Sequence, residues 1–537
     1  MRTRPRNTSK CSVKILPLRF CFSYFPLLIA GLCMPGCQQR EAGKGTLRVA
    51  NGAEPSTLDL HLATGQPELR ILGSIFEGLV RRGEKPGTVI PGVAQRWDIS
   101  SDGLTYTFHL RASLWSDGTA LTASDFVYSW RRFVSPVTAS EYGSMLKMIR
   151  NGIRVRNGEL PVDSLQVVAQ DDSTLVVSLE NPVTYFLDLC AFEPFAPVKQ
   201  AVIKMHGPTW TEPGNFVGNG PFILEKWERN VVVNVKRSTN YWDSKNVGLA
   251  SISFKSVEDQ LTAYNMFLAG ESDWLFSLPP SKLESARKTP GFFTGPMYGT
   301  FYLLFNCGNK GYDNSNLRKA LSYAIDRKTL VERVLKGLPL PATGFVPPTS
   351  GYPGTQLNLY STEKAIAFLA ASGYSAQSPP DHLQILYNNN ESNKTVAEVI
   401  QHMWRENLGL DAELVNFEWK VYLAQTKGRR YPSAARASWI GDFVDPVSFL
   451  ELGESDNGNN RSGYSNSHYD SLLNKSRVEP DAQVRLKILG EAEALLMEDM
   501  PIAPIYFYAL SELRTPRLKH AVPNPLGMYD WKTVTLK

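Results

Sequence analysis

Strand-like and helix-like patterns alternate along this 537-residue chain, and no period of 20–50 residues repeats. Apolar and polar residues in alternation, bounded by turn residues, are typical of strands. Strands are expected at residues 105–111, 174–179, 231–236 and 411–416. Apolar residues at helical spacing predict helices at residues 314–326, 362–371, 396–407 and 480–498. The mixture predicts an α/β protein and excludes a solenoid, and the length favours roughly three to four domain-sized units.

Helix boundaries can also be predicted from capping residues. Thr362 before Glu363 is typical of a helix start, and Gly373 and Gly409 are typical of helix stops. Ser124-Asp125 provides N-cap groups for a helix over residues 126–131.

The net charge is concentrated at the N-terminus. The chain has 57 Lys and Arg against 52 Asp and Glu, but six of the basic residues lie within residues 1–36 and the first acidic residue is Glu41. The remainder carries a charge of about −1, which argues against a nucleic-acid binder. Hydrophobic content of 43% and charged content of 20% are typical of a globular protein.

Residues 1–36 have the order of an export signal. A cationic stretch precedes an apolar run over residues 20–32, which is too short to span a membrane and contains Pro26. Met34-Pro35-Gly36-Cys37 resembles the lipobox of bacterial lipoproteins, with Met where Leu is usual, so we expect cleavage before Cys37 and its lipidation. Cys33 is a weaker candidate, and the alternative is an ordinary signal peptide. No later segment is long and apolar enough to cross a bilayer.

Few cysteines remain after this leader, and no catalytic signature follows it. The two are Cys190 and Cys307, and the sequence leaves open whether they pair. Neither has metal-ligand spacing, and the seven histidines are scattered. HExxH, GxSxG, Walker-type and GxGxxG motifs are missing, so we expect no enzyme, no metal and no cofactor.

Short motifs occur in a fixed order along the chain. They are NGAEPSTLDL (51–60), IFEGLV (75–80), PGVAQRW (91–97), SDGLTYTFHLRASLWSDGTALTASDFVYSW (101–130), GNGPF (218–222), NYWD (240–243), LRKALSYAIDR (317–327), NFEW (416–419) and WIGDFVDPVSFL (439–450). Together they resemble the extracellular solute-binding proteins of peptide ABC importers, family 5, the OppA/DppA type. Leu60 stands where that family usually has Pro. Residues 101–130, the most specific of these segments, are expected to be scaffold.

The resemblance implies a periplasmic-binding-protein-like type II (cluster C) α/β fold. Two lobes and an extra domain would surround a central ligand cleft that closes about hinges. The implied segments are 38–76, 184–300 and 510–537 for the first lobe, 77–183 for the extra domain, and 301–509 for the second lobe. A monomer is expected.

The resemblance also places candidate ligand-binding residues. Asp442 matches the family's acid for a peptide ammonium, with a loop-capping Asp as the alternative. Arg436 matches a position that meets the ligand carboxylate, for which a guanidinium offers a bidentate fork, with a solvated Arg as the alternative. The peptide would add as a strand between two edges. The residues that match those edges are Ser438, Trp439 and Ile440 on one side and Gly65 and Gln66 on the other.

Other matched positions differ from the family or have a structural alternative. Trp419 matches a position that lines a side-chain pocket in the family. Packing in the protein core is the alternative role for Trp419, and it is also the alternative for Trp439. Asn393 stands where some members have a His that helps to bind the peptide C-terminus, so it keeps donors but loses a potential charge. Ile440 replaces the family's common Cys, which excludes a disulfide at that position.

These features predict a lipid-anchored receptor in the periplasm or cell envelope. It would bind short peptides and deliver them to an inner-membrane ABC permease. The same scaffold also binds murein peptides, nickel chelates, haem or sugars, and fold does not decide among them. A secreted hydrolase and a purely structural envelope lipoprotein are the alternatives from other classes. Peptide length, the membrane that holds the anchor and the permease are undecided at this stage.

Overall fold

The computed structural model describes residues 45–83, 88–349 and 351–537. Residues 44–537 form one compact unit, which is described below. The predicted signal peptide and Cys37 lie outside the described residues. No helix in the described part of the chain is both long and apolar enough to cross a membrane.

One 11-stranded sheet extends through both lobes. Its strands in spatial order are β10 (Phe222–Glu228), β11 (Val232–Arg237), β12 (Ser251–Lys255), β1 (Thr46–Ala50), β13 (Trp274–Leu275), β19 (Ile502–Arg514), β14 (Phe292–Phe305), β18 (Ala434–Ile440), β16 (Gln384–Asn388) and β17 (Glu413–Phe417), with β15 (Leu340–Pro341) on β19. Strands β1 and β10–β13 lie within the segments expected for the first lobe, and β16–β18 lie within the segment expected for the second.

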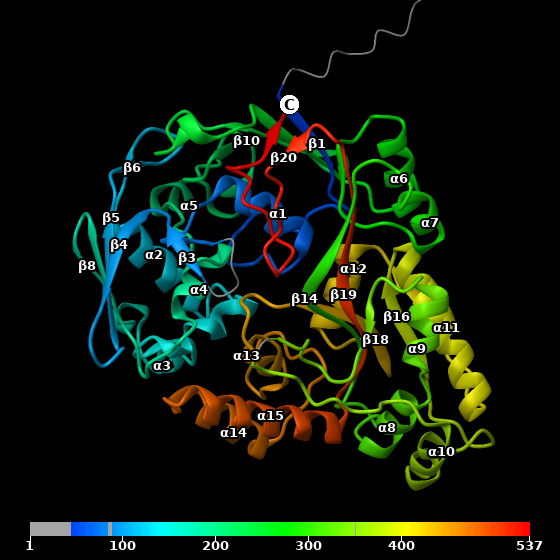
Figure 1. Ribbon diagram of the computed structural model, residues 1–537. Helices are drawn as coiled ribbons and strands as arrows, with labels where there is room; N and C mark the ends of the chain where they lie inside the picture. Colours follow the sequence, from blue (N-terminus) through cyan, green and yellow to red (C-terminus); the bar gives the residue numbers. More distant parts are fainter. Residues whose placement is uncertain (1–44, 84–87, 350) are drawn as a thin grey trace, which may run out of the picture. The chain divides into compact units, whose positions relative to one another are not determined.

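The long strands β14 and β19 connect these two groups. They pair antiparallel from Phe292 opposite Leu513 to Leu304 opposite Ile502. β19 also pairs with β13 of the first lobe, and β14 pairs with β18 of the second. Figure 1 shows β14 (green) and β19 (red) running side by side from the β1 end of the sheet to β18. Both lobes are therefore tied to the same pair of strands.

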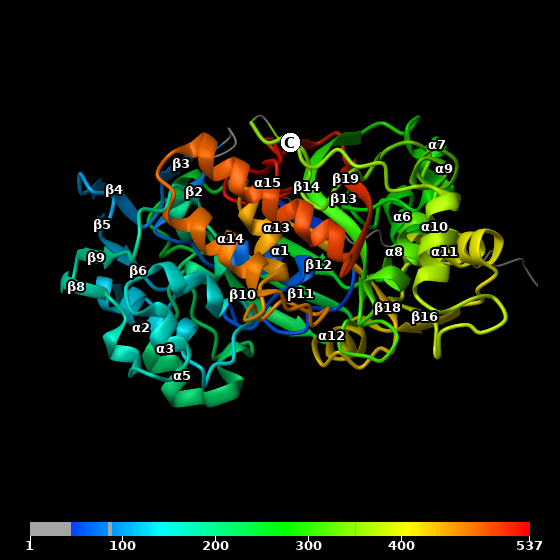
Figure 2. The same ribbon diagram turned by 90° about the horizontal axis from the view of Figure 1, so that it is seen from below.

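The extra domain has its own antiparallel sheet. Its order is β4 (Ala94–Ile99), β5 (Thr105–Leu110), β9 (Thr174–Ser178) and β8 (Val167–Asp171). Helix α2 (Ala123–Val134) packs on β8 and β9, with Phe126, Trp130 and Phe133 fully buried. Figures 1 and 2 both place this sheet on the opposite side of the structure from α10 and α11.

Short two-stranded ribbons and the helices complete the structure. The ribbons are β2 (Val80–Arg82) with β3 (Val89–Pro91), β6 (Ser113–Leu114) with β7 (Ala120–Leu121), and β20 (Leu518–Lys519) with β21 (Thr535–Leu536). The remaining α-helices are α1 (Gln66–Ile75), α3 (Gly152–Arg156), α4 (Phe186–Cys190), α5 (Gln200–His206), α6 (Gln260–Leu268), α7 (Leu283–Ala286), α8 (Ser315–Tyr323), α9 (Arg327–Thr329), α10 (Thr362–Ala371), α11 (Glu391–Leu408), α12 (Trp419–Lys427), α13 (Val447–Leu450), α14 (Ser467–Val478) and α15 (Ala482–Asp499).

All eight elements predicted from periodicity are present with shifted boundaries, and capping side chains explain two of the shifts. The predicted helix at 396–407 begins earlier, at Glu391, because the Asn390 side chain accepts a hydrogen bond from the Asn393 N–H. The predicted helix at 314–326 is interrupted after Tyr323, and Asp326 caps a new turn. Gly373 and Gly409 have positive φ at helix ends, as predicted.

One predicted cap was wrong. Helix α2 begins at Ala123 with Thr122 as the N-cap, so Ser124 lies inside the helix. Asp125 takes the N3 position, where its Oδ2 accepts the Thr122 backbone N–H at 2.9 Å. The two residues form a capping box, which satisfies two backbone donors at once.

The structure also answers the question about the cysteines. Cys190 is buried in the hydrophobic core, Cys307 is partly buried beyond the end of β14, and both are free thiols. Burial raises the pKa of both thiols.

Candidate functional site

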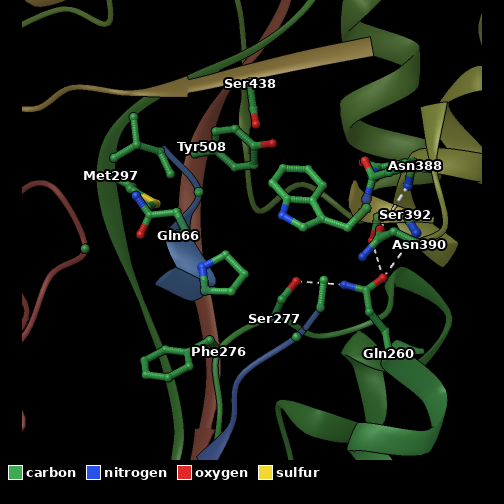
Figure 3. A pocket seen from close by; sticks show the side chains of 18 of the residues that line it. Gln66, Gln260, Phe276, Ser277, Met297, Asn388, Asn390, Ser392, Ser438 and Tyr508 are labelled. Carbon is green, nitrogen blue, oxygen red and sulfur yellow. Dashed lines mark hydrogen bonds between the residues drawn. The ribbon is translucent and has the colours of Figure 1, made fainter. Parts of the chain in front are cut away.

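A cavity of about 410 Å³ lies between the two lobes. Its walls come from the loop before α1, the ends of β13 and β16, the N-terminus of α12, and strands β18 and β19 (Figure 3). Every candidate ligand-binding residue predicted from the sequence contributes to the lining: Gly65, Gln66, Asn393, Trp419, Arg436, Ser438, Trp439, Ile440 and Asp442. Folding therefore brings these nine positions to one place.

Strand β18 presents an unpaired edge to this cavity. On one side it pairs with β14 over its whole length, from Ala434 to Ile440. On the other side β16 pairs only with Ala434 and Ala435. On this second side, residues 436–440 have no strand beside them among the described residues. An open strand edge is a template for an added strand.

Asp442 follows this strand and is buried, with 4% of its surface exposed. Its backbone N–H donates to Ser448 Oγ at 2.9 Å, and Arg82 donates to its carbonyl oxygen at 3.2 Å. Its Oδ2 atom is buried and has no hydrogen-bond partner among the described residues. Burial raises the pKa of Asp442 well above its usual range, Glu451 adds to this, and Arg82 opposes it. No ion pair in the described part of the chain includes the Asp442 side chain.

Arg436 projects from the open half of β18 and bonds only to neutral groups. Its guanidinium donates to Asn388 Oδ1 at 3.3 Å, Ser438 Oγ at 3.1 Å and Tyr508 Oη at 3.3 Å. Its Nε is buried without a partner, and none of the ion pairs in the described part of the chain includes it. This cation therefore has unused capacity for an anion.

Asn393 contacts this arginine indirectly, through Asn388. Its side-chain amide donates to Asn388 Oδ1 at 2.9 Å, and the same oxygen accepts from Arg436. The hydrogen bond from Asn393 fixes the Asn388 side chain, and Asn388 in turn positions the Arg436 guanidinium.

The two tryptophans present ring surface to the cavity. Trp439 Nε1 donates to Ser448 O at 2.8 Å, which holds the indole in place. Trp419 stacks on Tyr422 with 5.7 Å between ring centroids, and its Nε1 is buried without a partner. Both rings are only partly buried, so packing does not account for their whole surface.

Gly65 and Gln66 approach from the first lobe. A Cβ atom on Gly65 would overlap Glu68 Oε2 and lie 3.1 Å from Trp419 Cζ2 of the second lobe. Glycine therefore allows the close approach of backbone and ring. Gln66, the first residue of α1, lies on the cavity wall in Figure 3.

Several lining residues were not predicted from the sequence. Gln260 Nε2 donates to Ser277 Oγ at 2.7 Å, while its Oε1 accepts from Ser392 N at 3.1 Å and Ser392 Oγ at 2.9 Å (Figure 3). Because Gln260 lies in the first lobe and Ser392 in the second, these bonds cross the cleft. Other unpredicted lining residues are Arg70, Tyr142, Glu258, Phe276, Asn388 and Tyr508. Only the run of three asparagines at 388–390, at a strand-to-helix junction, offered a local signal.

No group of three or more His, Cys, Asp or Glu side chains within the described residues has the arrangement of a metal site.

A mixed α/β fold of two lobes and an extra domain around a central cavity defines a type II periplasmic binding protein. Residues 88–461 match the family described as "Bacterial extracellular solute-binding proteins, family 5 Middle", and the chain belongs to that family. The predicted family and fold class are thereby confirmed.

Relatives match nearly the whole chain. The oligopeptide-binding protein OppA of Bacillus subtilis (strain 168) is 34% identical over 510 residues, which is 92% of this chain and 93% of that protein. The solved structure of the Escherichia coli murein tripeptide binding protein MppA is 35% identical and covers 92% of this chain and 99% of its own, with a TM-score of 0.89.

The arrangement of the lobes differs from an open state. The unliganded open form of MppA, also 35% identical over 92% of this chain and 98% of its own, reaches a TM-score of only 0.64. Together with the Gln260–Ser392 bonds across the cleft, this lower score indicates that the lobes of this chain are closed.

Proposed function

We propose that this chain captures oligopeptides in the closed inter-lobe cavity and delivers them to the permease of an ABC importer, without catalysis. The observation that carries the proposal is the open half of β18, with Asp442, whose Oδ2 has no hydrogen-bond partner among the described residues, beyond one end and the Arg436 guanidinium, which forms no ion pair with them, at the other. A peptide has matching groups in the same order: an ammonium, a ladder of amides and a carboxylate.

Each lining residue then has a role. Asp442 binds the ammonium and Arg436 the carboxylate, while backbone groups of Ser438, Trp439 and Ile440 pair with the peptide as an added strand. The segment at Gly65 and Gln66 contacts the other edge of the peptide. Trp419 and Trp439 line side-chain pockets, and Asn393 positions Arg436 through Asn388.

The named ligands of relatives support two candidate ligand classes. The OppA relative is named for oligopeptides, which favours the main proposal. The MppA relative is named for a murein tripeptide, and its high structural similarity makes a murein peptide the second candidate.

The remaining proposals concern organisation and location. We infer a lipid anchor at Cys37 after removal of residues 1–36, and a location in the periplasm or cell envelope. The domain segments 38–76, 184–300 and 510–537, 77–183, and 301–509 remain proposed boundaries. Fatty-acid labelling that is lost in Cys37→Ser would support the anchor, whereas retained labelling would contradict it.

Calorimetric titration of the purified protein with a library of di- to hexapeptides tests the ligand. Micromolar or tighter binding by members of the library is the expected result, and no binding by any member would contradict the proposal. Mass spectrometry of co-purified ligand separates the two candidates, since a murein peptide contains residues that ordinary peptides lack.

A further inference from the structure

Six charged side chains line the cavity, and four of them lack an ionic partner. The six are Arg70, Glu258, Arg436, Asp442, Arg461 and Glu512. Two are paired, because Arg461 Nη2 lies 3.0 Å from Glu141 Oε2 and Glu512 Oε2 lies 2.8 Å from Arg514 Nε. The other four take part in no ion pair within the described part of the chain. Two of those four are arginines, which stay protonated at neutral pH.

The proposed function uses one of the two arginines and leaves Arg70 unexplained. Arg70 lies on α1 one turn after Gln66, so both side chains lie on the same face of the helix. Its Nη1 donates to the Asn51 carbonyl oxygen at 3.0 Å and to Asn51 Oδ1 at 3.1 Å. The guanidinium lies over the Phe276 ring, 4.3 Å from its centroid, and Figure 3 shows Phe276 and Gln66 on the cavity wall. Its Nε and Nη2 groups bond to none of the described residues.

Two acids, Glu512 and Glu68, act on Arg70 through their charge and raise its pKa, but neither forms an ion pair with it and both are held by other groups. Glu512 is held by Arg514, Trp274 Nε1 at 2.8 Å and the Tyr529 hydroxyl at 2.6 Å. Glu68 is fully buried, its Oε1 accepts from the Ser56 N–H at 2.6 Å, and burial raises its pKa. Burial lowers the pKa of Arg70 itself to about 10, which leaves it charged at neutral pH.

The free carboxyl groups of the cavity do not neutralise it either. Burial, together with repulsion from Glu418, raises the pKa of Glu258 to about 7. Neither Glu258 nor Asp442 is among the groups whose charge acts on Arg70. Asp442 follows β18 in the second lobe, and in the proposed function it binds the peptide ammonium. A peptide with two free termini brings one carboxylate, which satisfies Arg436 and leaves Arg70 unpaired in a closed cavity. An unpaired buried charge is costly, so a ligand with one more carboxylate suits this cavity better.

We propose that Arg70 binds a side-chain carboxylate of the ligand, so that the site favours peptides containing Asp or Glu. This inference rests on the proposed function and narrows its substrate class. Arg70 offers two free N–H directions beside an aromatic ring, and a guanidinium with free N–H groups can bind a carboxylate through two bonds.

Paired peptides test the inference. Alanine-based tri- to pentapeptides with one Glu, or one Gln, at each position in turn are titrated calorimetrically into the full-length protein. At one position the Glu peptide is expected to bind about tenfold or more tightly than its Gln counterpart. Arg70→Gln should remove this difference by weakening the Glu peptide while leaving the Gln peptide within about twofold. Arg70→Lys should keep part of it, because it retains the charge but not the fork.

The possible outcomes distinguish a failure of this inference from a failure of the proposed function on which it rests. Peptide binding with equal affinity for Glu and Gln at every position would overturn the role of Arg70 and leave the proposed function intact. A Glu preference that survives in Arg70→Gln would also overturn it. Absence of binding by every peptide contradicts both. The wild-type comparison needs no variant, and an unfolding midpoint without ligand that is not lower than that of the wild type shows that Arg70→Gln folds.

Discussion

At the scale of single residues, the cavity contains charged side chains that form no ion pair in the described part of the chain. Asp442 Oδ2 and Arg436 Nε are buried and unsatisfied, whereas most buried polar atoms in proteins have a partner. Such groups lower the stability of the ligand-free protein and are satisfied when a complementary ligand enters. Their separation along β18 is therefore best explained by binding.

Replacing Asp442 by Asn should weaken peptides and stabilise the empty protein. The change removes the counter-ion of the ammonium, so affinity for peptides with a free amino terminus should fall by about 2–5 kcal/mol. N-acetylated peptides should change little, and calorimetry compares the two sets. Equal losses for both sets would contradict the assigned role.

The pH dependence of stability gives an independent reading of the same variant. Folding raises the pKa of Asp442 above its ordinary 3.8, so the folded state holds a proton more tightly than the unfolded chain. The wild type without ligand should therefore lose stability as the pH rises from about 4 through the raised pKa. Asp442→Asn should remove that loss, so the variant should be more stable than the wild type at neutral pH in denaturant titrations.

At the scale of elements, the decisive feature is a strand that ends its pairing early. β16 covers only the first two residues of β18, and the chain then leaves β16 at Asn388 to enter α11. The exposed edge points into the cavity and not into bulk solvent, which reduces the risk of edge-to-edge aggregation.

If a peptide adds to this edge, its own backbone amides carry affinity. N-methylation of one amide that faces β18 should weaken binding by about 0.5–1.5 kcal/mol or more, since it removes a donor. Strand groups alternate in direction, so N-methylation of an amide that faces away serves as the matched control and should have a smaller effect. Titration of a series methylated at successive amides should show this alternation, and a uniform loss would argue against strand addition.

At the scale of the whole molecule, contacts between distant segments hold the cleft closed. Lys147 of the extra domain pairs with Glu454 of the second lobe, and Glu454 also lies 2.6 Å from Arg477. Burial alone would raise the pKa of Glu454, but Arg477 and Lys147 lower it to about 2. Arg461 and Glu141 link the same two parts at 3.0 Å.

Glu454→Gln should destabilise the closed protein strongly, because it removes the carboxylate with which both Lys147 and Arg477 form their ion pairs. A loss of about 3–5 kcal/mol at pH 7 is expected in guanidinium unfolding. In the wild type the contribution is complete above the ordinary pKa of 4.5 and is lost as the pH falls through about 2. Glu498→Gln is the control, since that side chain is 73% exposed in its pair with Lys319 and should cost less than about 1 kcal/mol. Similar losses for both variants would contradict this assignment.

Much of the fold and of the candidate site could be predicted because the signals are local. Alternation in residues 105–111 is enough for a strand, and Gly373 and Gly409 are enough to end helices. The positions Arg436, Ser438 and Asp442 follow from the resemblance of one continuous segment, residues 436–442, to the family, and the structure places them on one cavity. The cap of α2 was wrongly assigned to Ser124 because Thr122 and Asp125 both carry capping groups and the local pattern does not rank them.

The order of residues therefore accounts for the α/β pattern, the family and most of the positions along β18, since periodicity and short motifs record which side chains are to be buried. Only the tertiary structure decides which charges remain unpaired. That Arg70 forms no ion pair with the described residues, that Asn393 acts through Asn388, that Lys147 meets Glu454, and that Cys190 and Cys307 stay free all depend on distances between segments far apart in the chain. Such distances follow from how the two lobes and the extra domain pack together, which no local pattern encodes.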